Sequence, residues 1–168
     1  ETGLQIGPGH DDKSGVYLCL EMLRLLPNVK VAFFTQEESG CVGSHEAYTP
    51  FFHDCTMIIQ QDRNAYAGPE LITYTNGSDI CSDEFGKAAT PLMKKYEYIE
   101  SSGTCTDVGA LKANKDIDCI ALNLCAAYYD EHTSDEVLSV RGFENCINFA
   151  YELLTTLGNT KWNHVAEK

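Results

Sequence analysis

The 168-residue sequence lacks a long hydrophobic run and has few positive charges. A membrane-spanning helix needs about 20 consecutive apolar residues, and no window approaches that length. Lysine and arginine total 12 against 25 acidic residues, which gives a formal net charge of -13. Nucleic acids and anionic membranes bind basic surfaces, so this charge argues against both as partners. An acidic surface also promotes solubility in general, and the charge alone therefore selects no function.

The sequence also has no cysteine pair in C-x-x-C spacing, although it contains eight cysteines. Several of them, including Cys19, Cys119 and Cys125, lie inside apolar runs. A cysteine in such a run behaves as a small hydrophobic residue, so we interpret these as buried free thiols rather than a disulfide framework. Disulfides persist in oxidising compartments, and no signal peptide is recognisable. We therefore expect a cytoplasmic protein.

No internal repeat, low-complexity segment or linker divides the chain, and its length suits one domain spanning residues 1–168. Hydrophobic periodicity and turn residues predict helices at 14–26, 44–48, 83–95 (interrupted at Pro91) and 137–157, and strands at 29–35, 56–60, 71–75, 96–100 and 117–124. Strands that alternate with helices indicate an α/β fold. We expect a three-layer α/β/α domain with a mainly parallel central sheet.

Polar clusters follow the predicted strands, where functional groups of such sheets collect. Glu37 and Glu38 follow the strand at 29–35, and Asp62 follows the strand at 56–60. His132 lies in the segment after the strand at 117–124, and Asp11 precedes the first helix. Carboxylate and imidazole ligands from four loops are thus predicted to meet at one edge of the sheet.

Each of these clusters also has a simpler interpretation. Acidic residues favour the first turn of a helix, so Asp11 and Asp12 could be caps. The pair at 37–38 could lie in a solvated loop, although adjacent carboxylates favour a nearby cation or a shared proton. His132 could be a surface residue. Asp107 is interpreted as a helix cap, with a position in the cleft as the alternative. Asp135 and Glu136 could lie on a solvated face, or one of them could orient His132.

Two motifs carry a resemblance to a known family. Residues 9–15 (GHDDKSG) and residues 34–44 (FTQEESGCVGS) resemble the DDK-type and paired-glutamate motifs of co-catalytic zinc exopeptidases. This group contains peptidase T, carboxypeptidase G and the lidless zinc aminopeptidases. The resemblance extends from about Gly7 to His132. It implies a zinc exopeptidase-like fold and a metal-dependent peptidase, with an aminopeptidase as the expected activity.

The resemblance also implies a function for individual residues. Asp11 would bridge two zinc ions, Glu37 would be the general base, and Tyr128 or Tyr129 would stabilise the oxyanion. The remaining implied metal ligands are Glu38, Asp62 and His132. Metal-activated water would hydrolyse a terminal bond of a peptide or small amide. Cobalt or manganese would also suit a carboxylate-rich site with one histidine.

The sequence departs from the family pattern in two respects. The family has an H-x-D element before the DDK motif, and this sequence begins after it, so we expect an N-terminal segment to be missing. Substitution by His10 and a non-catalytic relative that binds a peptide or acts structurally are the alternatives. Only seventy positions separate Asp62 from His132, so we expect no lid or dimerisation insert. Hydrolysis of another amide, such as an N-acyl amino acid, is the alternative activity.

Overall fold

The central strand, β5 (Ile120–Cys125), is buried along its whole length in the computed structural model, which describes residues 7–162. Successive side chains of a strand point to opposite faces. Accordingly, Ile120, Leu122 and Leu124 belong to the main hydrophobic core, whereas Ala121 packs in a separate cluster with Val108. Both faces of the sheet are therefore covered.

The sheet has two parallel and two shorter antiparallel pairings. Its strands are β1 (Met57–Arg63), β2 (Glu70–Thr75), β3 (Ser78–Asp79), β4 (Ile99–Gly103) and β5, in the order β1-β5-β2-β3 with β4 also on β2. The parallel pairs are β1 with β5 and β2 with β4. In the described part of the chain, β1 has β5 as its single partner. A separate hairpin joins β6 (Tyr128–Tyr129) and β7 (Val137–Leu138).

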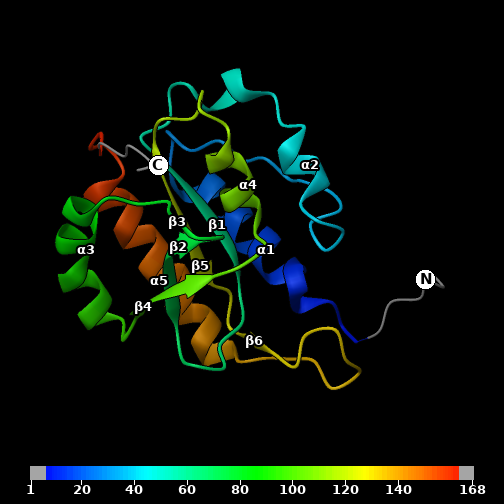
Figure 1. The fold of residues 1–168 in the computed structure, drawn as a ribbon. Coiled ribbons are helices and arrows are strands. Elements are labelled where there is room, and N and C mark those ends of the chain that lie inside the picture. Colours follow the sequence, from blue (N-terminus) through cyan, green and yellow to red (C-terminus); the bar gives the residue numbers. More distant parts are fainter. Residues whose placement is uncertain (1–6, 163–168) are drawn as a thin grey trace.

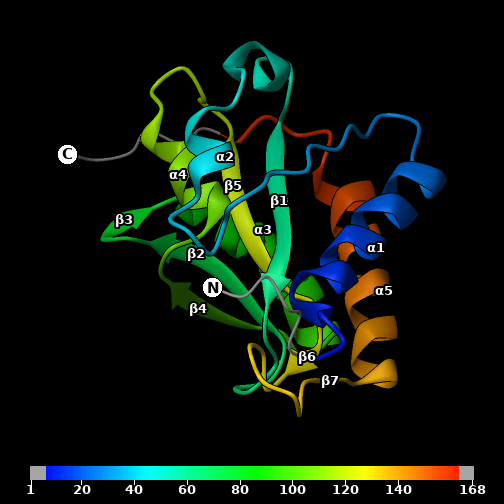
Figure 2. The ribbon, with the colours of Figure 1, turned by 90° about the vertical axis from the view of Figure 1, so that its right-hand side faces the viewer.

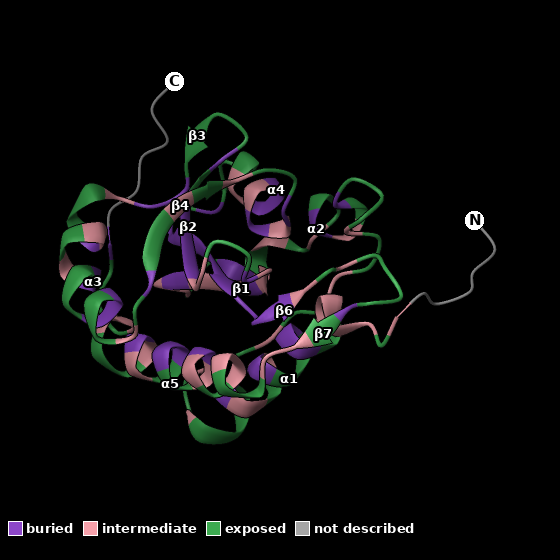
Figure 3. Cartoon of the chain, turned by 90° about the horizontal axis from the view of Figure 1, so that it is seen from below, coloured by how far each residue is buried: buried purple, intermediate pink, exposed green. Residues whose placement is uncertain are grey.

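Helices cover both faces of the sheet (Figures 1 and 3). On one face lie α1 (His10–Leu25), α3 (Asp83–Lys95) and α5 (Val140–Leu157), which contribute Leu18, Phe85 and Phe149 to the main core. On the other lie α4 (Asp107–Ala113) and α2 (Val42–His45), followed by a 3-10 turn at Thr49–Phe52. The predicted three-layer arrangement with a mostly parallel sheet is confirmed.

The first helix packs unusually close to β1, and a glycine allows it. A Cβ added at Gly15 would lie 1.8 Å from the carbonyl oxygen of Gln61. No other residue type fits at this distance without moving the helix or the strand. The close approach brings the amino end of α1 beside β1 (Figure 2).

The strand predicted at residues 29–35 is wrong, because this segment has no regular hydrogen bonding. Its residues are half-buried or exposed, and Phe33 retains 56% of its surface. β-branched and aromatic residues favour a strand, but a strand forms only against a partner backbone. Within residues 7–162 this segment has no such partner.

Two smaller predictions also need correction. Pro91 does not interrupt its helix, because α3 continues through it to Lys95. The proline is exposed, while Phe85, Ala89 and Leu92 keep the opposite face of α3 buried. The last predicted helix begins at Val140 rather than residue 137, because residues 137–138 pair as β7.

All eight cysteines are free thiols, and five of them are buried.

Among residues 7–162, no helix combines the length and the apolar character that crossing a bilayer requires.

Candidate active site

Three predicted site residues from three distant segments meet at one point. The Nε2 atom of His132 lies 2.8 Å from Asp11 Oδ2 and 2.7 Å from Glu38 Oε1. All three ligand atoms lie within 4.8 Å of one another, and no other group of this kind occurs among the residues that the structure describes. Partial burial alone would lower the pKa of His132, but the two carboxylates raise it. The arrangement gathers one imidazole nitrogen and two carboxylate oxygens around a common point.

The backbone turn that carries Asp11 is held by Glu136. The Glu136 side chain accepts hydrogen bonds from the N–H groups of Gly9 and Asp11, both at 2.7 Å. Glu136 is only 5% exposed, so these bonds form away from bulk water. Glu136 therefore holds the loop that carries Asp11, whereas the sequence makes it a candidate to orient His132.

Asp11 and Asp12 are adjacent but make different contacts. Both have non-helical backbone angles, and the peptide bond between them is cis. Asp12 Oδ1 accepts a hydrogen bond from the Gly15 N–H at 2.9 Å, which satisfies a free donor at the start of the regular helix. Asp12 is therefore the helix cap, while Asp11 faces His132. Burial, and then the charges of Asp11, Glu37 and Asp107, raise the pKa of Asp12 to about 8, although the Gly15 bond lowers it.

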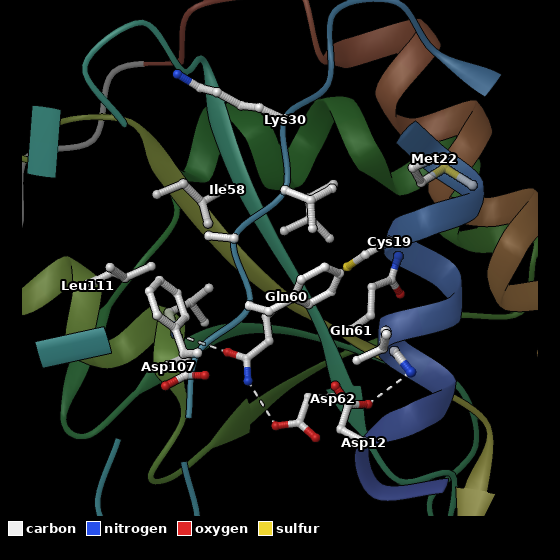
Figure 4. Close-up of a pocket in the computed structure, with 18 of the residues that line it drawn as sticks. Asp12, Cys19, Met22, Lys30, Ile58, Gln60, Gln61, Asp62, Asp107 and Leu111 are labelled. Carbon is white, nitrogen blue, oxygen red and sulfur yellow. Dashed lines mark hydrogen bonds between the residues drawn. The ribbon is translucent and has the colours of Figure 1, made fainter. Parts of the chain in front are cut away.

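Asp62 lies near this cluster, at the end of β1. Burial, followed by the charges of Asp12, Asp11 and Glu37, raises its pKa well above the usual range for an aspartate. Its Oδ2 accepts a hydrogen bond from Gln60 Nε2 at 2.8 Å (Figure 4). Asp62 is thus a buried carboxylate among other carboxylates.

Tyr128 and Tyr129, the two residues of β6, have their side chains on opposite sides of the strand. The Tyr128 hydroxyl donates to Asp62 Oδ1 at 3.3 Å. Tyr129 instead packs edge-to-face against Tyr66, with ring centroids 5.8 Å apart. Of the two candidates, Tyr128 is the one on the side of the acidic cluster.

Glu37 stands beside the three-residue group without belonging to it. Burial, and then the charges of Glu38, Asp107 and Asp11, raise its pKa to about 7, although the charge of His132 lowers it. The Cys41 thiol contacts Glu37 Oε1 at 3.9 Å. A carboxyl with a pKa near neutrality is suited to exchange protons.

Asp107 takes the cleft position that the sequence offers only as the alternative to a helix cap. It was expected to cap a helix, but Thr106 occupies the cap position of α4, and no side chain bonds there. Asp107 Oδ1 instead accepts a hydrogen bond from Ser44 Oγ at 2.6 Å, and Asp107 lines the cavity (Figure 4). It lies close enough to Glu37 to raise the pKa of that residue. The Thr106-Asp107 pattern is typical of a cap, and nothing in the sequence places it beside residue 37. His10, the alternative ligand, is not in the three-residue group or among the cavity residues.

A cavity of about 1040 Å³ extends from these acidic groups along β1 (Figure 4). Asp11, Glu37, Glu38, Asp62 and His132 all contribute to its lining. Farther along, its walls are more apolar and come from α1, β1 and residues 27–34.

The donor set fits a divalent cation. One nitrogen and two oxygens around a point would leave a coordination position open, as in catalytic metal sites. Burial, and after it the charges of neighbouring carboxylates, raises the pKa values of Asp12, Glu37 and Asp62, and a nearby cation would favour their ionised forms. The charge of Asp11 contributes to the raised pKa of Asp62, so these two carboxylates lie close enough to interact.

Sequence comparison identifies one family. The profile described as peptidase family M28 matches residues 3–152. No curated protein sequence matches the chain.

Solved structures with the same fold share few identical residues with this chain. A TET aminopeptidase from a marine sediment archaeon of the Thaumarchaeota has a TM-score of 0.66 at 19% identity, with 91% of this chain and 49% of that chain covered. PhTET1-12s, described as a dodecamer, has a TM-score of 0.65 at 17% identity, covering 86% and 48%. The TET1 peptidase of Pyrococcus horikoshii, described as assembling into a tetrahedron or a large octahedral shell, has a TM-score of 0.61 at 18% identity, also covering 86% and 48%. The chain therefore spans about half the length of these structures.

Proposed function

The chain belongs to peptidase family M28, and on that premise we propose that it forms the catalytic core of a zinc-dependent aminopeptidase. The observation that carries this proposal is the meeting of Asp11, Glu38 and His132, with Glu37 beside them. The solved structures of similar fold are described as aminopeptidases or peptidases, which agrees with the proposed activity.

Five residues would hold two divalent ions and handle the proton. Asp11, Glu38 and His132 would hold one ion, and Asp11 with Asp62 would contribute to a second. Ions held there would lower the pKa of a bound water toward neutrality and polarise the scissile carbonyl. Zinc binds nitrogen and carboxylate oxygen ligands, which suits this donor set.

Glu37 is proposed as the proton acceptor. It is next to the ligand Glu38, yet it does not share the three-residue group. Its carboxylate can therefore take a proton from the attacking water and deliver it to the leaving amine. The hydroxyl of Tyr128, beside Asp62, is proposed to donate a hydrogen bond to the developing oxyanion.

The substrate is proposed to be a peptide with a free amino terminus. The acidic end of the cavity holds more carboxylates than nearby cationic side chains, so it would attract an ammonium group and repel a terminal carboxylate. Glu38 is 61% exposed at the side chain, which leaves it accessible from the cavity mouth. The excess of carboxylates over cationic side chains is the feature that favours an aminopeptidase over a carboxypeptidase.

A Glu37→Gln variant tests the proposed proton acceptor. The glutamine keeps the shape of the side chain but cannot take a proton, so kcat on aminoacyl substrates should fall roughly 10²–10⁴-fold. Metal content, measured on the same zinc-loaded sample, should be unchanged because Glu37 is not a proposed ligand. Glu46→Gln, at an exposed position in the same region, is the matched control and should keep full activity.

The alternatives predict different results. Turnover of N-acyl amino acids in place of aminoacyl substrates would favour the other amide hydrolase. Absence of turnover together with fewer than two bound ions would favour a non-catalytic relative. Full activity in the Glu37→Gln variant would refute the assigned base.

A further inference from the structure

Three polar side chains meet next to Asp62, on the face of the sheet that α4 covers. Gln60 and Asn123 are aligned partners in the parallel pairing of β1 with β5. Thr106 precedes α4, and it is only 4% exposed, as is Asn123. A polar side chain loses its bonds to water on burial, which is costly unless it finds partners within the protein. The partners of these three residues therefore indicate what the group does.

The group fixes the orientation of the Gln60 amide. Thr106 Oγ1 donates a hydrogen bond to Gln60 Oε1 at 2.5 Å and accepts one from Asn123 Nδ2 at 3.2 Å. Gln60 Oε1 also accepts a hydrogen bond from the Val108 N–H at 2.9 Å. Exchange of the oxygen and the nitrogen of this amide would place its N–H groups against the Val108 N–H, which is itself a donor. The oxygen therefore faces α4, and the nitrogen faces away from it.

The nitrogen of this fixed amide donates to Asp62. Gln60 Nε2 lies 2.8 Å from Asp62 Oδ2, and the longer bond from the Tyr128 hydroxyl reaches Oδ1 (Figure 4). Asn123 holds the backbone of the same residue. Its Oδ1 accepts from the Asp62 N–H at 3.0 Å, and its Nδ2 donates to the Asp62 carbonyl oxygen at 3.3 Å. Both the backbone and the carboxylate of Asp62 are thus held by this group.

Helix capping alone explains only part of these contacts. The Val108 N–H is one of the donors left free at the start of α4, and the side chain of the cap residue Thr106 does not bond to the helix. Gln60 satisfies this N–H through its oxygen, which a carboxylate would do as well. The amide nitrogen adds a donor, and its partner is Asp62. A glutamine at this position therefore suits the orientation of a carboxylate as well as the capping of a helix.

We propose that Gln60 is a positioning residue for Asp62 and that Thr106 and Asn123 keep it in place. This inference rests on the proposed function, in which Asp62 contributes to the second of two metal ions. Gln60 acts through Asp62, because it fixes the direction of the carboxylate before an ion is bound. A ligand that is already oriented loses less conformational freedom when the ion binds, so the ion binds more tightly.

The effect should be confined to one of the two proposed ions. The amide nitrogen of Gln60 bonds to Asp62, and Asp62 is not a member of the three-residue group of Asp11, Glu38 and His132. Loss of the Gln60 amide should therefore weaken the ion that Asp62 helps to hold and leave the other unchanged. A general loosening of the fold would weaken both.

A Gln60→Met variant tests the proposal, because methionine keeps the length of the side chain but loses the amide donor and acceptor. Zinc binding, measured in competition with a chelator, should show one of two binding steps weakened by about 10–100-fold. Gln61→Met is the matched control, since the same change falls on the opposite face of β1. Gln61 is also buried, and its Oε1 has no hydrogen-bond partner, so both of its binding steps should stay as in the unaltered protein.

Two further variants separate the possible outcomes. Asp62→Ala should remove the same step that Gln60→Met weakens. Thr106→Val frees the Gln60 oxygen from one of its two donors and has a closely similar shape, so it should weaken that step by a smaller factor. It also keeps the test valid should Gln60→Met not fold, which circular dichroism would reveal.

The results that would overturn the inference differ from those that would overturn the proposed function. A step that is lost in Asp62→Ala but unchanged in Gln60→Met would overturn the positioning of Asp62 alone. Equal weakening of both steps in Gln60→Met and Thr106→Val would also overturn it, because the loss would then come from the fold in general. Two intact steps in Asp62→Ala would refute Asp62 as a ligand, and the inference with it. The readout is metal affinity rather than activity.

Discussion

The acidic residues near the amino end of α1 differ in function because of what each one contacts. Asp11 faces His132, and its neighbour Asp12 caps the helix through the Gly15 N–H. Glu136, more than a hundred positions away, accepts from two N–H groups of the loop that carries Asp11. In the sequence these residues are all simply acidic. Their separation into a proposed metal ligand, a helix cap and a support for the loop comes from these contacts.

Glu136→Ala should weaken metal binding although Glu136 contacts no ligand atom. Loss of its two hydrogen bonds frees the loop of Asp11, and changes in groups that orient a ligand typically cost about 10–100-fold in metal affinity. Titration with zinc under competition by a chelator measures the loss. Asp135→Ala, at the exposed neighbouring position, is the control and should bind zinc as the unaltered protein does. Equal affinity in both variants would show that the loop does not depend on Glu136.

At the scale of elements, the position of α1 depends on one small residue. The helix can bring its capped end to β1 because Gly15 has no side chain at the contact with Gln61. The segment at 29–35 shows the converse case, since residues that suit a strand remain irregular where no partner backbone is present. In this fold, the strand preference of residues 29–35 therefore does not decide their conformation, because no partner backbone is present among the described residues.

Gly15→Ala should destabilise the fold by about 1–3 kcal/mol, because the added methyl group overlaps the Gln61 carbonyl and must push α1 away from β1. Gly86→Ala on α3 is the matched control, because its added Cβ has no neighbour closer than 4.0 Å. That substitution should stabilise the protein by roughly 0.5–1 kcal/mol through better helix propensity. Urea unfolding measures both changes. A Gly15→Ala variant as stable as the control would contradict the close approach.

At the scale of the whole molecule, several of the 25 acidic residues line one cavity. Asp12, Glu37 and Asp62 all have raised pKa values, chiefly because they are buried. Burial of several carboxylates together opposes their ionisation. The stability of the molecule should therefore depend on both pH and divalent metal.

The metal-free protein should lose stability as the pH rises from about 5 to about 8. The pKa of Asp12 is raised from 3.8 to about 8, and that of Glu37 from 4.5 to about 7, so the folded state binds more protons than the unfolded state across this range. The raised pKa of His132 acts in the same direction. Thermal unfolding in a chelator at several pH values should show a falling Tm, and Asp12→Asn should flatten the slope.

Zinc should reverse this pH dependence. A metal that binds the folded state raises its stability, and it binds better when its ligands are deprotonated. The gain in Tm on adding zinc should therefore increase with pH over the same range. A metal-free Tm that rises with pH, or a zinc effect that is largest at low pH, would contradict the raised pKa values of these carboxyl groups.

The sequence by itself determined the three-layer fold, because the hydrophobic period of its strands and helices is a local property. It also determined which residues are candidates for the site, through the motifs at Asp11 and at Glu37 and Glu38. Only the tertiary structure decided that Asp12 caps a helix, that Asp107 lines the cavity and that residues 29–35 have no strand partner. Those outcomes depend on which backbone and side-chain atoms from distant segments come into contact, and no local pattern contains that information.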